Sequence, residues 1–248
     1  MQDHQLLRYS RQIMLPGMDV AGQQKLLDAT VLIVGLGGLG SPVAMYLAAA
    51  GVGHLVLADA DTVDLTNLQR QIAHHNDSIG ELKVESAQKT LHALNPDVRV
   101  TCLPLRLAGE DMERAVSNAT VVVDATDNFT TRFALNEACV AARVPLVSGA
   151  AIRMEGQVAV FDPRRADSPC YHCLYQRGAE EDASCANNGV MAPLVGIIGS
   201  VQAMETIKLI AGIGDTLTGR LLLLDARSLQ WRELRLLRDP GCPVCGAA

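Results

Sequence analysis

The chain has 248 residues, of which 49% are hydrophobic, 19% are charged and 3% are aromatic. This composition is typical of an ordered globular protein and excludes a disordered chain, a collagen and a coiled coil. The net charge of -6 at pH 7 and the scarcity of aromatic residues argue against nucleic-acid binding, which requires basic surfaces or stacking platforms.

The first 28 residues predict a polar, helical arm. They contain no continuous apolar segment of the kind that an export signal requires. Four of the seven cysteines form two CxxC pairs, which is unlike the disulfide framework of a secreted protein. We therefore expect reduced thiols and a cytoplasmic location.

Residues 31–59 predict a strand, a helix and a second strand. The run 31–34 is aliphatic and β-branched, as in a buried parallel strand. An alanine-rich helix follows, for which Ser41 is the expected cap and Pro42 the first helical residue. Glycines at 51 and 53 end this helix, and 54–59 reads as the next strand.

Between the first strand and the helix, residues 35–40 read GLGGLG, which fits the pattern G-x-G-x-x-G. In that position, backbone N–H groups and a helix N-terminus face an anion. Asp59 ends the next strand, where an acidic residue commonly binds a ribose hydroxyl. These features alone fit an NAD-dependent oxidoreductase equally well.

The remaining pattern predicts a doubly wound, Rossmann-like sheet that is mostly parallel, with an antiparallel C-terminal extension. Three further strands are predicted at 98–103, 121–125 and 146–149, and two helices at 83–94 and 131–143. The C-terminal strands are predicted at 156–162, 220–225 and 229–236, around one strong helix within 190–214.

The helix within 190–214 is apolar enough to raise the question of a membrane span. Pro193 and Gln202 interrupt it, and Glu205 and Lys208 can pair at its surface. We therefore expect a buried helix of a soluble protein and no membrane partner.

Polar side chains follow the predicted strands at the edge where parallel sheets bind their ligands. Residues 59–71 read DADTVDLTNLQRQ, and Lys83 and Asp127 come later. Arg70 can hold phosphate oxygens as a fork and Lys83 as a point charge. Asp127 can hold Mg²⁺, which prefers carboxylate and phosphate oxygens. Each residue alone is more often a solvated charge, but their shared position favours a site.

Several motifs occur in this chain in the order in which one family has them. They are RYSRQ at 8–12, GLGGLG at 35–40, NLQRQ at 67–71, TDN at 126–128, SGAAIRMEGQ at 148–157, and the CxxC pairs. Over nearly its whole length the chain resembles the adenylyltransferases of the MoeB, ThiF and HesA family, which activate ubiquitin-like sulfur carriers. GVMAPL at 189–194 is more similar to the molybdopterin-synthase branch than to the thiamine branch.

The resemblance implies a single adenylation domain over 1–248. Its parts are the arm 1–28, a nucleotide-binding half 29–150, and a carrier-binding and zinc half 151–248 with a flexible loop at 163–189. The implied reaction is ATP-dependent adenylation of the C-terminal glycine of a sulfur carrier with a Gly-Gly tail, in molybdenum cofactor biosynthesis. The thiamine-biosynthesis carrier is the alternative substrate, and a non-catalytic zinc scaffold is a further alternative.

The resemblance also implies site residues. The nucleotide positions are Gly38, Asp59, Thr66, Asn67, Leu68, Gln69, Arg70, Lys83, Asp127 and Asn128. Among these, Arg70, Lys83 and Asp127 are implied to act in catalysis, with Mg²⁺ on Asp127. The arginine that matches Arg11 reaches the triphosphate from the second subunit, which implies a homodimer.

The cysteines fall into three groups. Cys170, Cys173, Cys242 and Cys245 have the spacing of a closed structural zinc site, with a redox CxxC as the alternative. Cys102 and Cys139 lie in apolar surroundings and are expected in the core. Cys185 matches a family cysteine that accepts the activated carrier as a thioester or acyl disulfide. The alternative is an inert loop cysteine, because nearby carboxylates raise a thiol pKa.

Overall fold

The computed structural model describes residues 1–176 and 189–246. In these residues the strands are β1 (Thr30–Val34), β2 (His54–Ala58), β3 (Arg99–Leu103), β4 (Val121–Asp124), β5 (Leu146–Ile152), β6 (Glu155–Phe161), β7 (Arg220–Asp225) and β8 (Gln230–Arg235). They form one sheet in the order β3-β2-β1-β4-β5-β6-β7-β8. The pairs from β3 to β5 are parallel, and those from β5 to β8 are antiparallel. The predicted doubly wound sheet with an antiparallel extension is confirmed.

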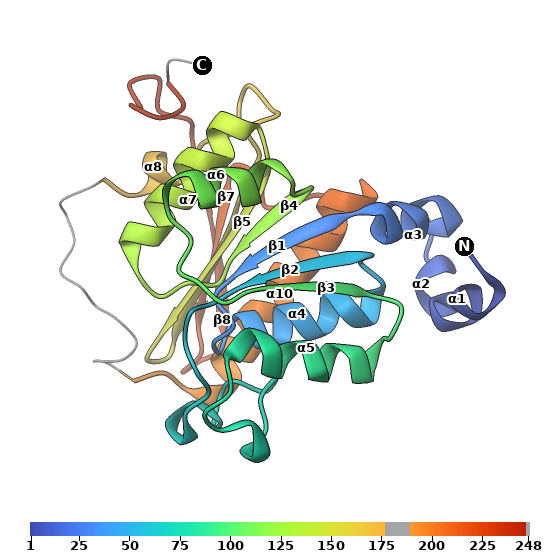
Figure 1. Ribbon diagram of the computed structural model, residues 1–248. Helices are drawn as coiled ribbons and strands as arrows, with labels where there is room; N and C mark the ends of the chain where they lie inside the picture. Colours follow the sequence, from blue (N-terminus) through green and yellow to red (C-terminus); the bar gives the residue numbers. More distant parts are fainter. Residues whose placement is uncertain (177–188, 247–248) are drawn as a thin grey trace.

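Helices cover both faces of this sheet (Figure 1). They are α1 (Asp3–Arg8), α2 (Ser10–Ile13), α3 (Asp19–Asp28), α4 (Gly40–Ala50), α5 (Lys83–Leu94), α6 (Gly109–Ser117), α7 (Phe129–Ala142), α8 (Tyr171–Leu174) and α10 (Ala192–Ala211), with 3-10 turns η1 (Leu65–Asn67) and η2 (Asn76–Ser78). The helices α4, α5 and α10 lie on one face, and α6 and α7 lie on the other.

The strand β1 shows why the central sequence is apolar throughout. Side chains alternate across a strand. Val31 and Ile33 therefore pack into the core under α4 and α10, while Leu32 and Val34 pack into the core under α6 and α7. A strand that is buried on both faces therefore favours apolar residues at successive positions.

The start of α4 differs from the prediction. The helix begins at Gly40 with Leu39 in the N-cap position, so Ser41 is not the cap. The Ser41 N–H already donates to the Gly37 carbonyl at 3.0 Å, so the helix starts two residues earlier than predicted. Pro42 is therefore the third helical residue and not the first, although it still lies in the first turn. Gly51 ends the helix in the left-handed conformation, as predicted.

Two short helices are absent from the sequence-based prediction. The helix α6 buries Met112 and Val116. Their spacing of four residues is the pattern in the sequence that indicates a helix here. The helix α8 lies in the described part of the predicted loop 163–189. The rest of that loop, at 177–188, lies outside the described residues.

The helix α10 has 20 residues and is apolar enough, by length and composition, to cross a membrane. In the structure it packs against α4 and β5, and 56% of its most apolar window is buried. The predicted pair of Glu205 and Lys208 forms, but not at the surface. Glu205 is buried, and its carboxylate also accepts a hydrogen bond from the Leu217 N–H at 2.7 Å. This bond and the pairing with Lys208 offset the cost of burying the charge.

Of the two cysteines predicted in the core, Cys139 is buried under α7. Cys102 is half-buried, because β3 is the outermost strand on its side of the sheet.

Candidate functional site

A cavity of about 430 Å³ lies at the carboxyl ends of β1, β2 and β4. The strand order reverses here, since β2 flanks β1 on one side and β4 flanks it on the other. Open α/β sheets bind their ligands at such a point. From the glycine-rich loop the cavity continues toward β5, β6 and β7, where Ile152, Gln157 and Leu223 line it.

Six of the predicted site residues line this cavity. They are Gly38, Asp59, Arg70, Lys83, Asp127 and Asn128. They come from four separate segments of the chain, which the parallel sheet brings to one edge. This common location is what the sequence predicted for the polar residues that follow the strands.

The other predicted residues do not line the cavity. Thr66, Asn67, Leu68 and Gln69 lie in and just after η1. The Thr66 N–H and hydroxyl both bond to Asp64 Oδ1, at 2.8 and 2.6 Å. Cys185 lies outside the described residues.

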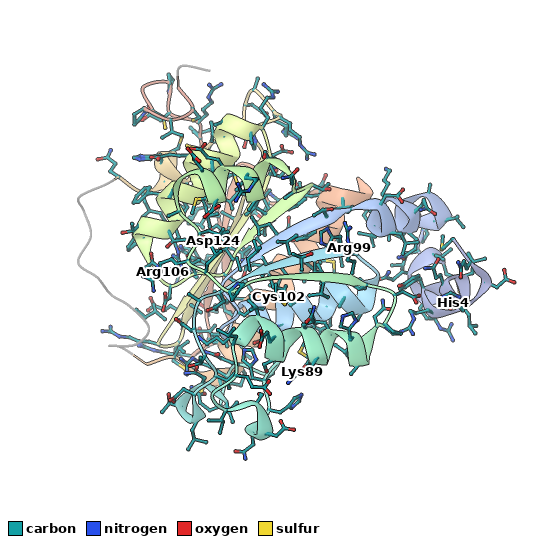
Figure 2. All side chains as sticks on the ribbon, in the orientation of Figure 1. His4, Lys89, Arg99, Cys102, Arg106 and Asp124 are labelled. Carbon is teal, nitrogen blue, oxygen red and sulfur yellow. The ribbon has the colours of Figure 1, made fainter. Side chains whose placement is uncertain are left out.

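Arg11 lies at the opposite edge of the sheet, exposed on α2. The neighbouring helix α1 contacts the chain where α5 ends, through Arg8 Nη1 and the Leu94 carbonyl at 3.1 Å. Figure 2 shows His4 of α1 far from Arg106 and Asp124, which lie near the cavity. Arg11 therefore does not reach the cavity of its own chain.

The glycine-rich loop is held in a fixed shape by Asp59. Asp59 Oδ2 accepts a hydrogen bond from the Leu36 N–H at 2.7 Å, and its Oδ1 accepts one from the Asp61 N–H at 2.9 Å. In the described part of the chain, the next N–H groups, of Gly37, Gly38 and Leu39, have no acceptor. They line the cavity in front of α4, where an anion is stabilised.

Gly40 is the position in this loop at which a side chain fits least. A Cβ there would lie 1.9 Å from the carbonyl oxygen of Gly35. Because backbone cannot rotate away as a side chain does, Gly40→Ala is expected to cost about 3 kcal/mol of stability, a Tm decrease of roughly 6 to 12 °C. Thermal unfolding measures this effect.

The matched control for this substitution is Gly196→Ala in α10. A Cβ at Gly196 meets nothing within 4 Å, and alanine favours a helix over glycine. The control is expected to keep or raise the Tm. An equal Tm for Gly40→Ala and the wild type would contradict the close approach.

Lys83 brings a buried cation to the cavity. It is the first residue of α5, and its side chain is 8% exposed. Its Nζ lies 2.9 Å from Asp61 Oδ2, and the Asp61 side chain is 61% exposed. Asp61 was not a predicted site residue, although it belongs to the predicted polar run. Its exposed carboxylate can turn into water when another anion approaches Lys83.

A buried ion pair supports the loop that carries Asp127. Arg132 Nη2 donates to the Thr126 carbonyl at 2.6 Å, and Arg132 Nε lies 3.8 Å from Asp124 Oδ2. Asp124 accepts hydrogen bonds from the Thr126 N–H and hydroxyl and from the Ser148 hydroxyl. Burial alone lowers the pKa of Arg132, and Asp124 raises it above its ordinary value. The guanidinium is therefore charged.

Asp127 itself is exposed, and its carboxylate has no partner among the described residues. The next residue, Asn128, caps α7, and its Oδ1 accepts from the Thr131 N–H at 2.9 Å. The backbone is thus fixed on both sides of a free carboxylate. Such an arrangement leaves Asp127 available to a cation.

Besides Asp61, sequence reasoning missed several polar side chains of the cavity wall, among them Gln71, Arg106, Arg132 and Tyr175. Gln71 is buried, and its Oε1 has no hydrogen-bond partner. Tyr175 Oη donates to Gln157 Oε1 at 2.9 Å. Only Arg132 had a sequence signal, because the aspartate that ends the apolar run VVVD needs a buried partner.

The predicted cysteine cluster is present away from this cavity. The sulfurs of Cys170, Cys173, Cys242 and Cys245 all lie within 4.8 Å of one another. The closest separations are 3.5, 3.6 and 4.0 Å. A tetrahedral ion with Zn–S bonds of about 2.3 Å requires sulfurs about 3.8 Å apart. The four side chains can therefore hold one metal ion with little movement.

Comparison with known proteins gives the following relatives. The ThiF family model matches residues 9–244. The chain is 50% identical over 246 residues to the molybdopterin-synthase adenylyltransferase of Salmonella typhimurium, covering 99% of this chain and 98% of that protein. It is 50% identical over 248 residues to the sulfur carrier protein ThiS adenylyltransferase of Escherichia coli, covering 100% of this chain and 98% of that protein. The crystal structure of E. coli MccB with ATP has a TM-score of 0.81 at 26% identity, over 92% of this chain and 70% of that chain.

Proposed function

This chain belongs to the ThiF family and is an adenylyltransferase, and from this premise we propose that it activates a ubiquitin-like sulfur carrier with ATP. The C-terminal glycine carboxylate of the carrier attacks the α-phosphorus, which gives an acyl-adenylate and releases pyrophosphate. The proposed carrier is the small subunit of a molybdopterin synthase. The observation that carries the proposal is the cavity in which free N–H groups of the glycine-rich loop meet Arg70, Lys83 and Asp127.

The proposed reaction needs no general base, because a carboxyl group with a pKa of about 3.5 is already ionised at pH 7. The main barrier is electrostatic, since the carboxylate and the triphosphate are both anions. At 4 Å their repulsion is about 1 kcal/mol in water and about 4 kcal/mol at an effective dielectric constant of 20. Cations at the site must offset it.

The cavity residues divide this task among them. Gly38 lies against the nucleotide, Asp59 faces the ribose, and Arg70 and Lys83 hold the phosphates. Each oxygen of Asp59 already accepts one backbone hydrogen bond, and a carboxylate oxygen can accept another. Asp127 holds Mg²⁺, which supplies positive charge to the phosphate oxygens.

The part of the cavity that extends toward β5, β6 and β7 suits the carrier tail. It is lined by Ile152, Gln157 and Leu223 and leads from the glycine-rich loop to the outer part of the sheet. A Gly-Gly tail has no side chains, so its backbone can lie directly against these residues. We place the activated carboxylate at the end of this part that is nearest to the glycine-rich loop, next to the phosphates.

The proposed enzyme is a homodimer in which Arg11 acts on the partner subunit's nucleotide. The position of Arg11 supports this proposal, because it is exposed on α2 at the edge of the sheet opposite to its own cavity. Cys185 remains the predicted acceptor of the activated carrier.

The cysteine cluster is proposed to bind Zn²⁺ in a structural role. The fit of the sulfur separations to a tetrahedral ion supports this assignment. Four thiolates leave no open coordination position, so the metal takes no part in the reaction. It joins the α8 segment to the C-terminal segment that carries Cys242 and Cys245.

Pyrophosphate exchange tests the reaction directly. With ATP, Mg²⁺ and a molybdopterin-synthase small subunit, labelled pyrophosphate is expected to enter ATP. Adenylation is reversible, so labelled pyrophosphate attacks the acyl-adenylate and re-forms ATP and the carrier carboxylate. A carrier without its terminal glycine is the control and should give no exchange. The thiamine carrier is tested in parallel. Absence of exchange with both carriers would refute the proposed function.

The GLGGLG motif and Asp59 alone also allowed an NAD-dependent oxidoreductase. The relatives named above do not support that function, because two are named adenylyltransferases and the third was solved with ATP.

A further inference from the structure

His74 is a buried titratable residue that the proposed reaction does not use. Its side chain is 5% exposed and lies behind the glycine-rich loop. Its Nε2 lies 3.0 Å from the Leu36 carbonyl, and its Nδ1 lies 2.9 Å from the Ser86 hydroxyl. One imidazole therefore spans the gap between the loop and α5.

The hydrogen bonds fix the tautomer of this ring. A carbonyl oxygen only accepts, so Nε2 carries the hydrogen and donates to Leu36. Burial lowers the pKa of His74 most, and Lys83 and His75 lower it further, while the Leu36 carbonyl and Asp59 raise it. The net pKa is below its ordinary value, and the ring is neutral at pH 7. Neutral Nδ1 is then an acceptor for the Ser86 hydroxyl.

The two peptide groups that flank Leu36 are both held. The Leu36 N–H donates to Asp59 Oδ2 at 2.7 Å, and the Leu36 carbonyl accepts from His74 Nε2 at 3.0 Å. The Leu36 carbonyl and the Gly37 N–H share one peptide plane, so the bond from His74 sets the direction of the Gly37 N–H and of the N–H groups that follow it. These are the N–H groups of Gly37 to Leu39, which have no acceptor in the described part of the chain.

The other side of the ring contacts the helix that begins with Lys83. Ser86 lies in α5, three residues after Lys83, so both belong to its first turn. Ser86 Oγ also lies 3.0 Å from Ser78 Oγ in η2, and the single hydroxyl hydrogen of Ser86 serves either this contact or the one to His74 Nδ1 at a time. His74 thus fixes the position of the glycine-rich loop relative to α5, the helix that begins with Lys83.

We propose that His74 is a positioning residue for the nucleotide, which holds the glycine-rich loop in register with the helix that carries Lys83. The identity of the ligand as ATP rests on the proposed function. His74 touches no phosphate itself. It acts through Leu36 and Ser86, so its loss should weaken nucleotide binding while the residues that contact the nucleotide remain.

Two substitutions of His74 separate positioning from simple core packing. His74→Leu removes both hydrogen bonds and is expected to raise the Kd of a non-hydrolysable ATP analogue with Mg²⁺ about tenfold. His74→Gln keeps an amide N–H that can reach the Leu36 carbonyl, and its Kd is expected to stay within about threefold of the wild type. A packing role alone would give the two variants similar Kd values.

The matched control is His75→Leu. His75 is the neighbouring residue, but its side chain is exposed, and its Nε2 lies 3.4 Å from the Thr90 hydroxyl. This variant is expected to bind the analogue as the wild type does. Ser86→Ala tests the other end of the link and is expected to raise the Kd about threefold.

Amide hydrogen exchange provides a readout that needs no nucleotide. In His74→Leu the Leu36 amide, which donates to Asp59, is expected to exchange faster than in the wild type, while in His74→Gln and His75→Leu it is not. This measurement decides the proposal even if the wild type fails to bind ATP. The proposed function is judged separately, by pyrophosphate exchange of the wild type.

Unchanged Kd and unchanged exchange of the Leu36 amide in His74→Leu would overturn the proposal. If His74→Leu does not fold, Ser86→Ala decides, and a wild-type Kd in that variant would also overturn it. Wild-type binding of the analogue without any carrier-dependent exchange would refute the proposed function and leave the role of His74 intact.

Discussion

Replacement of Asp127 by alanine is expected to lower carrier-dependent pyrophosphate exchange on the order of 10²- to 10³-fold and to leave the Tm unchanged. The activity falls because the proposed Mg²⁺ loses its carboxylate ligand. The fold is kept because Asp127 is exposed and has no partner among the described residues. The loop around it is held by Thr126 and Asn128 instead.

The control for this substitution is Asp111→Ala. Asp111 is an exposed aspartate on α6 that pairs with Arg114 at the surface, and such pairs contribute little to stability. Its removal should change neither activity nor Tm. Near-normal turnover of Asp127→Ala at ordinary Mg²⁺ concentration would show that Asp127 does not hold the metal.

A mixture of Arg11→Ala and Asp127→Ala subunits extends the test to the dimer. If Arg11 serves the partner's cavity, each mixed dimer contains one intact site, and random mixing should restore about a quarter of the wild-type activity. If Arg11 served its own cavity, no mixed dimer would contain an intact site. Absence of recovery in dimers that have demonstrably exchanged subunits would therefore refute the shared site.

Replacement of Cys245 by serine is expected to remove bound zinc and to lower the Tm by roughly 8 to 16 °C. The proposed ion binds only the folded chain, and at a free concentration a thousandfold above its Kd it contributes about 4 kcal/mol. Metal analysis and thermal unfolding measure the two effects. A strong chelator should lower the Tm of the wild type and leave that of the variant unchanged.

Cys102→Ser is the matched control for the metal site. Cys102 lies outside the cluster, and its thiol donates to the Val84 carbonyl at 3.3 Å, a bond that a serine hydroxyl can also make. This variant should keep its zinc. If the purified wild type contains no zinc, the structural metal site is disproved.

Much of the candidate site was readable from the sequence because its parts are local. The apolar run of β1, the GLGGLG loop and the helix after it are consecutive, and each obeys a short-range rule of periodicity or turn geometry. The position of Asp59, Lys83 and Asp127 at one sheet edge followed from the alternation of strands and helices.

Three predictions of local structure failed or fell short for identifiable reasons. The expected cap at Ser41 was wrong because a hydrogen bond to Gly37 starts the helix earlier. The helix α6 was missed because the segment is short and mostly charged or polar, although Met112 and Val116 lie four residues apart on its buried face. The pairing of Glu205 with Lys208 was correct, but its burial was not predicted, because the hydrogen bond from the Leu217 N–H forms only when the segment after α10 folds back.

The sequence by itself determined the doubly wound sheet, the glycine-rich loop between β1 and α4 and the four cysteines that meet in one cluster. These depend on hydrophobic periodicity, glycine conformation and ligand spacing, which short segments express. Only the tertiary structure decided that Arg132 supports the Asp127 loop, that His74 joins the loop to α5, and that Arg11 lies far from its own cavity. A buried polar group must find a partner, and which partner it finds is set by the packing of segments that the sequence keeps far apart.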